Sequence, residues 1–187
     1  QNAHHLMPTE AKKAWIASMA AAGIEEIEVG SFVPAKLIPA MADTAEIVSF
    51  ALSIKNLKVV ALAPNAKGFE RAVASGAHKV TFPVSASRAH SLANVRMTPE
   101  QMVEEVRKCV QLRAQLSGTS GPEIEAGVAT AFGCTMQGEV PEDDVVRLAV
   151  MLAGTGADCI ALADTVGYAN RAQIRRLFRR VKNEIGD

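Results

Sequence analysis

The segment Glu123–Asp164, "EIEAGVATAFGCTMQGEVPEDDVVRLAVMLAGTGADCIALAD", decides the fold class. It reads as a strand (Glu123–Phe132), a helix (Pro141–Gly154) and a second strand (Asp158–Asp164), because two short apolar runs flank a segment with helical periodicity. Strands that alternate with helices run parallel in one sheet, with right-handed crossovers. The segment therefore predicts an α/β protein.

The same alternation extends outward from this segment over the rest of the chain. Further strands are predicted at Ile24–Val29, Leu57–Ala63 and His78–Val84, and further helices at Pro8–Gly23, Ala42–Ile54, Asn65–Gly76, Thr98–Leu116 and Asn170–Ile185. The strands are rich in Val, Ile, Leu and Ala, as expected when helices cover both faces of a parallel sheet.

Residues at helix starts support these assignments. Thr98 precedes a helix with Pro99 at its first position, and Gln101 completes a capping box. Thr9 is expected to cap the first helix and Gly23 to end it.

Two architectures accommodate five strands alternating with helices, namely an open doubly wound sheet and a (β/α)₈ TIM barrel. No strand is followed by a glycine-rich dinucleotide or phosphate loop, which disfavours the open nucleotide-binding sheet. A typical barrel has roughly 250 residues. The 187 residues, taken as one domain, are therefore expected to hold part of a barrel, and the start at Gln1 without a Met leads us to expect a piece of a longer chain.

The composition excludes several classes of function. Lys plus Arg and Asp plus Glu number 20 each, so we expect neither nucleic acid nor a membrane as partner. Three widely spaced cysteines fit a reducing, cytoplasmic compartment. The basic cluster between Arg175 and Lys182 has the spacing of a solvated helix face.

Polar residues recur where the predicted strands end, which is where a barrel carries its active site. The set comprises Glu28, Ser31, Asn65, Ser85, Ser87, Thr130, Cys134, Asp164 and Thr165. Glu28 and Asp164 follow apolar runs, and a carboxylate at a buried strand end is costly unless it is paired, bound to a metal or used.

Several candidate residues also have a purely structural interpretation. Asp164 is equally compatible with a loop acid that aids capping, and Glu28 with a buried ion pair. Cys134 fits a small buried residue. His90, in the loop after the third strand, could approach a substrate, but an exposed loop histidine is the favoured interpretation. The adjacent His4 and His5 do not face one metal site.

Longer motifs of the chain match a known enzyme family. They are "PTEAKKAWIASMAAAGIEEIEVGSFVPAKLIPAMAD" (Pro8–Asp43), "APNAKGFERAV" (Ala63–Val73), "FGCTMQGEV" (Phe132–Val140) and "LADTVG" (Leu162–Gly167). Together with Gln1–Asn2 they resemble the 3-hydroxy-3-methylglutaryl-CoA lyase family, a metal-dependent branch of the lyase and Claisen-type TIM barrels. The resemblance runs through essentially all 187 residues.

The resemblance implies roles for particular residues. Asp164 is implied as a catalytic residue near the substrate hydroxyl, and Glu28 as a catalytic residue that orients an Arg. Gln1, Ser31, Ser87 and Thr165 are implied as substrate-binding residues. The family's Arg–Asp pair is expected before residue 1 and its His-x-His pair after residue 187, so the chain holds about strands two to six and no metal ligand.

The resemblance also implies the chemistry and the partners. The expected reaction is the retro-Claisen cleavage of 3-hydroxy-3-methylglutaryl-CoA to acetyl-CoA and acetoacetate, of the kind used in leucine degradation and ketone body metabolism. Mg²⁺ or Mn²⁺ is the expected cofactor. An acyl-CoA is the expected small-molecule partner, and a homodimer or higher homo-oligomer is the expected assembly. The 187 residues by themselves are expected to be inactive.

One segment departs from the family pattern. The family usually has "AASE-x-F-x-x-KN" where this chain has "SASRAHSLAN", Ser85–Asn94, so Arg88 replaces an acid and the basic pair before Asn94 is absent. Gly127 stands where some members have a Tyr. Alternatives are therefore a related Claisen-type lyase or synthase acting on another 3-hydroxyacyl substrate, and a non-catalytic barrel relative.

Overall fold

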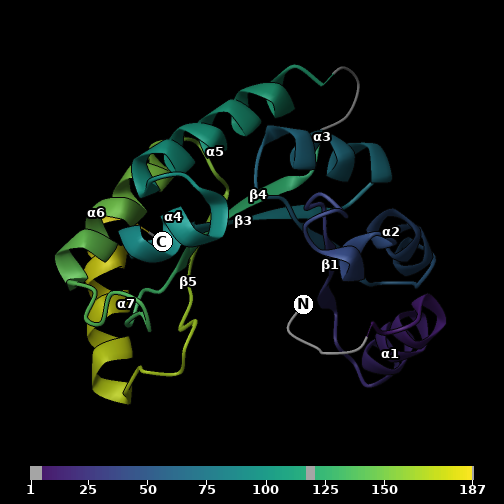
Figure 1. The fold of residues 1–187 in the computed structure, drawn as a ribbon, viewed down its shortest axis with the longest axis horizontal. Coiled ribbons are helices and arrows are strands. Elements are labelled where there is room, and N and C mark those ends of the chain that lie inside the picture. Colours follow the sequence, from purple (N-terminus) through teal and green to yellow (C-terminus); the bar gives the residue numbers. More distant parts are fainter. Residues whose placement is uncertain (1–5, 117–120, 187) are drawn as a thin grey trace. The chain divides into compact units, whose positions relative to one another are not determined.

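The computed structural model describes residues 6–116 and 121–186 and has an α/β fold with a parallel five-stranded sheet (Figure 1). The order of the strands is β1-β2-β3-β4-β5, which is also their order along the chain. The predicted α/β class and parallel sheet are therefore confirmed. Gln1 and the pair His4–His5 lie outside the described residues.

The elements alternate as the sequence predicts, with one additional helix and a short 3₁₀ turn. The strands are β1 (Glu26–Ser31), β2 (Lys58–Leu62), β3 (Lys79–Ser85), β4 (Glu123–Ala129) and β5 (Cys159–Leu162). The helices are α1 (Thr9–Ala21), η1 (Pro39–Met41), α2 (Thr44–Leu52), α3 (Ala66–Ser75), α4 (Arg88–Val95), α5 (Pro99–Ala114), α6 (Glu142–Ala153) and α7 (Arg171–Ile185).

The chain forms two compact units, and each has its own buried residues. The first unit comprises residues 1–81 and 113–123, and the second comprises residues 82–112 and 124–187. In the first unit α1 packs against α2, α2 packs against β1 and β2, and α3 packs against β2. In the second unit α6 packs against α7 and β5.

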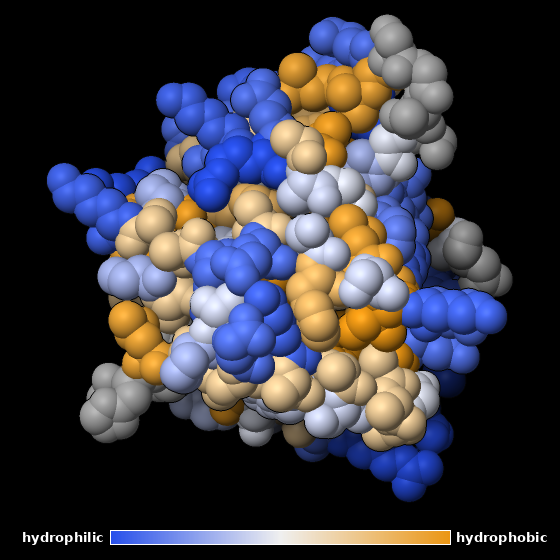
Figure 2. Space-filling model, turned by 90° about the vertical axis from the view of Figure 1, so that its right-hand side faces the viewer, coloured by the Kyte–Doolittle hydropathy of each residue, from blue (hydrophilic) through white to orange (hydrophobic). Residues whose placement is uncertain are grey.

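Apolar side chains from strands and helices fill both cores. The first unit buries Ile47, Val48, Ala51, Val59, Ala61 and Phe69, and the second buries Phe82, Val84, Met102, Ile124, Leu152 and Leu177. The side of the molecule where α1, α2 and α3 lie in Figure 1 also exposes hydrophobic residues among charged ones (Figure 2). Among the exposed hydrophobic side chains of the first unit is Trp15, at 60% exposure.

The helix caps agree with the sequence at one predicted position and disagree at another. The Thr98 N–H donates to Gln101 Oε1 at 2.8 Å, and the Gln101 N–H donates to Thr98 Oγ1 at 3.2 Å, so the predicted capping box is confirmed. The predicted Thr9 cap is wrong, because Pro8 occupies the cap position of α1. The Thr9 hydroxyl instead donates to Asp43 Oδ2 at 2.7 Å.

The first strand lies two residues further along the chain than predicted, and it contains an irregularity. Its pairing with β2 shifts register between Glu28 and Gly30, so the strand continues through Gly30 instead of ending there. A Cβ on Gly30 would lie 2.8 Å from Thr44 Cγ2. Glycine therefore fits here because a buried Thr44 occupies the space of a side chain.

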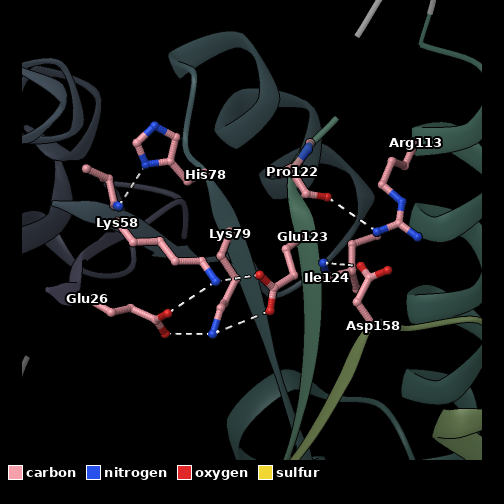
Figure 3. Close-up of polar contacts among 10 residues, drawn as sticks. Glu26, Lys58, His78, Lys79, Arg113, Pro122, Glu123, Ile124 and Asp158 are labelled. Atoms are coloured by element: carbon pink, nitrogen blue, oxygen red, sulfur yellow. Dashed lines mark hydrogen bonds and ion pairs between the residues drawn. The ribbon is translucent and has the colours of Figure 1, made fainter. Parts of the chain in front are cut away.

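The amino ends of the first four strands carry a cluster of two glutamates and two lysines (Figure 3). Lys79 Nζ lies 2.6 Å from Glu26 Oε1 and 3.7 Å from Glu123 Oε1. Lys58 Nζ lies 2.5 Å from Glu123 Oε2 and 3.3 Å from Glu26 Oε2. The hydrogen bond from Lys79 lowers the pKa of the Glu26 carboxyl, although burial acts in the opposite direction. This cluster lies at the strand ends opposite to those that carry a barrel's active site, so we interpret it as stabilising.

Candidate functional site at the strand ends

Two threonine side chains, which accept backbone hydrogen bonds, link the carboxyl ends of β3, β4 and β5 in the second unit. The Ser87 N–H donates to Thr130 Oγ1 at 3.0 Å, and the Thr130 N–H donates to Thr165 Oγ1 at 2.7 Å. Each of these residues follows the last residue of its strand within three positions. The structure therefore brings together Ser87 and Thr165, which were both predicted as substrate-binding residues, through Thr130.

Thr130 is held in a backbone conformation that its residue type rarely adopts. Its φ is 57°, in the left-handed region, and the side chain is fully buried. The hydroxyl satisfies two groups, because it accepts from the Ser87 N–H and donates to the Ala129 carbonyl oxygen at 2.6 Å. A strained, buried residue that joins three strand ends is typical of a functional site.

Asp164 follows β5 and binds the backbone of its own loop. Its Oδ1 accepts from the Gly167 and Tyr168 N–H groups, and its Oδ2 accepts from the Ala169 N–H, each at 3.0 Å. The bond from Ala169 is the largest influence and lowers the pKa of the Asp164 carboxyl; burial opposes this, and the other backbone bonds add to it. The side chain is exposed and anionic at neutral pH. Asp164 thus accepts hydrogen bonds from the backbone of its loop, as expected for a loop acid.

Ser87 caps the helix that the sequence did not predict. Its hydroxyl accepts from the His90 N–H at 3.1 Å and donates to Gln137 Oε1 at 3.0 Å. The neighbouring Cys134 thiol is buried, which raises its pKa, but hydrogen bonds with Ser87 and with the backbone of Gln137 and Met136 outweigh burial and lower the pKa. Ser87 therefore caps α4 and also binds the loop after β4.

Ser85 and His90 form a further polar pair at the same strand end. Ser85 is the last residue of β3 and is 3% exposed, and its Oγ lies 2.6 Å from His90 Nδ1. The sequence placed His90 on an exposed loop, whereas the structure places it half-buried in the first turn of α4. The signal that identifies this helix is Ser87, a favoured cap residue.

The other two predicted site residues of the described chain lie in the first unit. Glu28 is exposed and lies in the middle of β1. It lines a groove of about 500 Å³ together with Trp15, Ile16 and Met41. Ser31 ends β1 at 1% exposure, and its Oγ has no hydrogen-bond partner among the described residues. Most buried hydroxyls in proteins have a hydrogen-bond partner, so Ser31 is an exception among the described residues.

The described residues do not include a set that fits a metal ion. Among residues 6–116 and 121–186, no three His, Cys, Asp or Glu side chains lie close enough together to hold one. No helix in the described part of the chain is long and apolar enough to cross a membrane.

Comparison with known proteins places these features in context. The family model described as HMGL-like matches residues 1–187. Hydroxymethylglutaryl-CoA lyase YngG of Bacillus subtilis is 32% identical over 178 residues, which are 95% of this chain and 58% of that protein. The 3-hydroxy-3-isohexenylglutaryl-CoA/hydroxymethylglutaryl-CoA lyase of Pseudomonas aeruginosa is 32% identical over 167 residues, 89% of this chain and 54% of that protein.

Solved structures agree with this likeness. An HMG-CoA lyase from A. baumannii, in complex with coenzyme A and 3-methylmalate, superposes with a TM-score of 0.89 at 34% identity, covering 98% of this chain and 58% of that one. Such neighbours are TIM barrels, which agrees with the prediction that the chain holds part of a barrel. The chain thus spans about half to three-fifths of the length of the relatives it matches.

Proposed function

Because the chain belongs to the HMGL-like family, we propose that the whole protein is a hydroxymethylglutaryl-CoA lyase that cleaves 3-hydroxy-3-methylglutaryl-CoA to acetyl-CoA and acetoacetate. The observation that carries the proposal is the family match over all 187 residues. We further propose that these residues contribute strands two to six of one barrel, and that they are inactive without the rest of it.

In this reaction the 3-hydroxyl of the substrate loses a proton and the bond between C2 and C3 breaks. The electron pair of that bond passes to the acetyl-CoA enolate, which then takes up a proton. Asp164 is the catalytic residue nearest this step, and its lowered pKa suits a carboxylate that accepts the hydroxyl's hydrogen bond and orients it. Glu28 has the supporting role of orienting an Arg.

Four residues are proposed to bind the substrate. Ser87 and Thr165 are supported by their link through Thr130 at the strand ends. Ser31 is supported by its buried hydroxyl, which lacks a partner among the described residues. Gln1 rests on the resemblance alone, since it lies outside the described residues.

The family is metal-dependent, and Mg²⁺ or Mn²⁺ is the proposed ion because both suit oxygen and imidazole ligands. The described residues do not form a ligand set. Hence no step of the reaction is assigned to the ion here. Its ligands are proposed to come from the Arg–Asp and His-x-His segments of the family.

The proposed partner is an acyl-CoA, and the proposed assembly is a homodimer or higher homo-oligomer in the cytoplasm, serving leucine degradation. Among relatives named for a compartment, one is cytoplasmic in Homo sapiens and one mitochondrial in Rattus norvegicus. They are 28% and 30% identical, each over 99% of this chain and over 49% and 56% of their own lengths. The three free cysteines favour the cytoplasm.

The test is acetoacetate release from 3-hydroxy-3-methylglutaryl-CoA by the whole protein with Mg²⁺ or Mn²⁺. Analogues with longer C3 substituents run in parallel, because a relative's name includes an isohexenyl substrate. Preferential cleavage of another analogue identifies a related Claisen-type lyase. Binding without cleavage of any analogue identifies a non-catalytic relative and refutes the proposal.

A further inference from the structure

Thr130 forms hydrogen bonds to residues that follow the strands on both sides of β4. Its Oγ1 accepts from the Ser87 N–H at 3.0 Å, and its own N–H donates to Thr165 Oγ1 at 2.7 Å. These bonds join positions that are 43 and 35 residues apart in the sequence. Thr130 is fully buried, so water does not compete for either bond. The position of Ser87 relative to Thr165 is therefore set through one residue.

Backbone bonds beside Thr130 join the same three strand ends. The Ala86 N–H donates to the Ala129 carbonyl oxygen at 2.9 Å, and the Ala131 N–H donates to the Ala163 carbonyl oxygen at 3.2 Å. The Thr130 hydroxyl donates to the same Ala129 oxygen at 2.6 Å. Its left-handed φ of 57° is unfavourable for a β-branched residue, and glycine would adopt it at lower cost. The backbone conformation thus disfavours threonine at this position, whereas the bonds of the hydroxyl favour it.

The two partners of Thr130 carry its position to other groups at the strand ends. Ser87 caps α4 and donates to Gln137 Oε1 in the loop after β4, so a shift of Ser87 moves both contacts. Thr165 is exposed and directly follows Asp164, whereas Thr130 is buried behind it. Thr130 is therefore placed to act through its neighbours and not by contact with a ligand.

We propose that Thr130 is a positioning residue of the lyase reaction, which holds Ser87 and Thr165 in one relative position through its hydroxyl and its N–H. The inference rests on the proposed function, in which Ser87 and Thr165 bind the substrate, and it adds a residue that acts only through them. Because both bonds meet at Thr130, the effects of Thr130→Val and Thr165→Val on substrate binding are expected to be non-additive.

The first experiment measures KM and kcat for acetoacetate release by the whole protein with its divalent cation. Thr130→Val removes the hydroxyl and keeps the shape of the side chain, and it is expected to raise KM about tenfold with kcat retained. Thr130→Ser keeps the hydroxyl and is expected to retain the wild-type KM. Thr130→Gly suits the left-handed backbone but lacks the hydroxyl, so its KM is expected to match that of Thr130→Val. A wild-type KM in Thr130→Val, or equal KM values in Thr130→Ser and Thr130→Gly, overturns the proposal.

Thr155→Val is the matched control, because it removes a buried threonine hydroxyl with similar bonds from a different end of the sheet. The Thr155 hydroxyl donates to the Leu152 carbonyl oxygen at 2.6 Å and accepts from the Ala157 N–H at 3.3 Å, but it precedes β5 instead of following a strand. We expect this variant to lose stability with an unchanged KM. A rise in KM equal to that of Thr130→Val would trace the effect to general destabilisation and overturn the proposal.

Amide hydrogen exchange separates this inference from the lyase proposal, because it requires no turnover. The Ser87 amide hydrogen is expected to exchange faster in Thr130→Val than in wild type. In Thr165→Val, faster exchange is expected at Ser87 as well as at Thr130, since the two bonds meet at Thr130. Faster exchange without acetoacetate release by wild type supports the coupling through Thr130 and refutes the lyase proposal. Acetoacetate release with unchanged exchange does the reverse, and unchanged exchange without release refutes both.

Discussion

Replacing Lys79 with Met tests whether burial determines the strength of the charge cluster at the strand starts. Lys79 is 7% exposed and binds Glu26 at 2.6 Å and Glu123 at 3.7 Å. Removing one member of a buried ion pair costs about 3–5 kcal/mol. The two acids are 43% and 33% exposed and keep Lys58 as a partner, which reduces the expected loss to roughly 2–3 kcal/mol.

The matched control is Lys58→Met, which removes the second lysine from the same two acids. Its side chain is 38% exposed, so we expect a loss of about 1 kcal/mol. Urea unfolding followed by circular dichroism measures both variants, and at a slope of about 2 kcal/mol per molar the Lys79 variant unfolds roughly 1 M earlier than wild type. If Lys58→Met lowers the free energy of unfolding as much as Lys79→Met, burial does not determine how strongly each lysine stabilises the fold, and the reasoning fails.

Three further predictions concern other parts of the chain. Gly30→Ala is expected to destabilise by about 1–3 kcal/mol, because its Cβ would lie 2.8 Å from Thr44 Cγ2; an unchanged urea midpoint contradicts the tight contact. Asp164→Asn in the whole protein is expected to lower kcat at least tenfold, about 1.4 kcal/mol of barrier, with little change in unfolding; a smaller fall in kcat shows that the assigned role is wrong. Lys79 lowers the pKa of the Glu26 carboxyl in the folded state. The ionised carboxyl therefore stabilises the fold above its unfolded pKa of about 4.3, and this contribution is lost as pH falls through its folded pKa. The free energy of unfolding measured between pH 5 and 3 should therefore depend less on pH in Glu26→Gln than in wild type. If the two proteins show the same pH dependence, Glu26 does not contribute to it.

The fold class followed from the sequence because alternation of strands and helices is a local pattern. The capping box at Thr98 was predictable for the same reason, since both of its partners lie within four residues. The tight contact at Gly30 was not predictable, because it is made with Thr44, which lies 14 positions away in a different element. The short α4 was missed because a segment of eight residues gives little periodic signal.

The candidate site was only partly predictable. Strand-end positions identified Ser87, Thr130 and Thr165, but only the structure shows that Thr130, in a left-handed backbone conformation, joins the other two. Glu28 attracted attention as a carboxylate in an apolar run, but the same pattern did not reveal that Glu26 and Glu123 pair with Lys58 and Lys79 across the strand starts. Which of these residues contact one another depends on interactions between positions that are distant in sequence.

The three backbone bonds of Asp164 have a consequence for how the end of β5 responds to ligands. Both carboxylate oxygens are already engaged by the N–H groups of Gly167, Tyr168 and Ala169. A group that binds the same oxygens must share them with these donors or displace them. Ligand binding and the conformation of the loop therefore both depend on the two carboxylate oxygens of Asp164. The exchange of these three amide hydrogens with solvent is therefore a local reporter of what Asp164 is bound to.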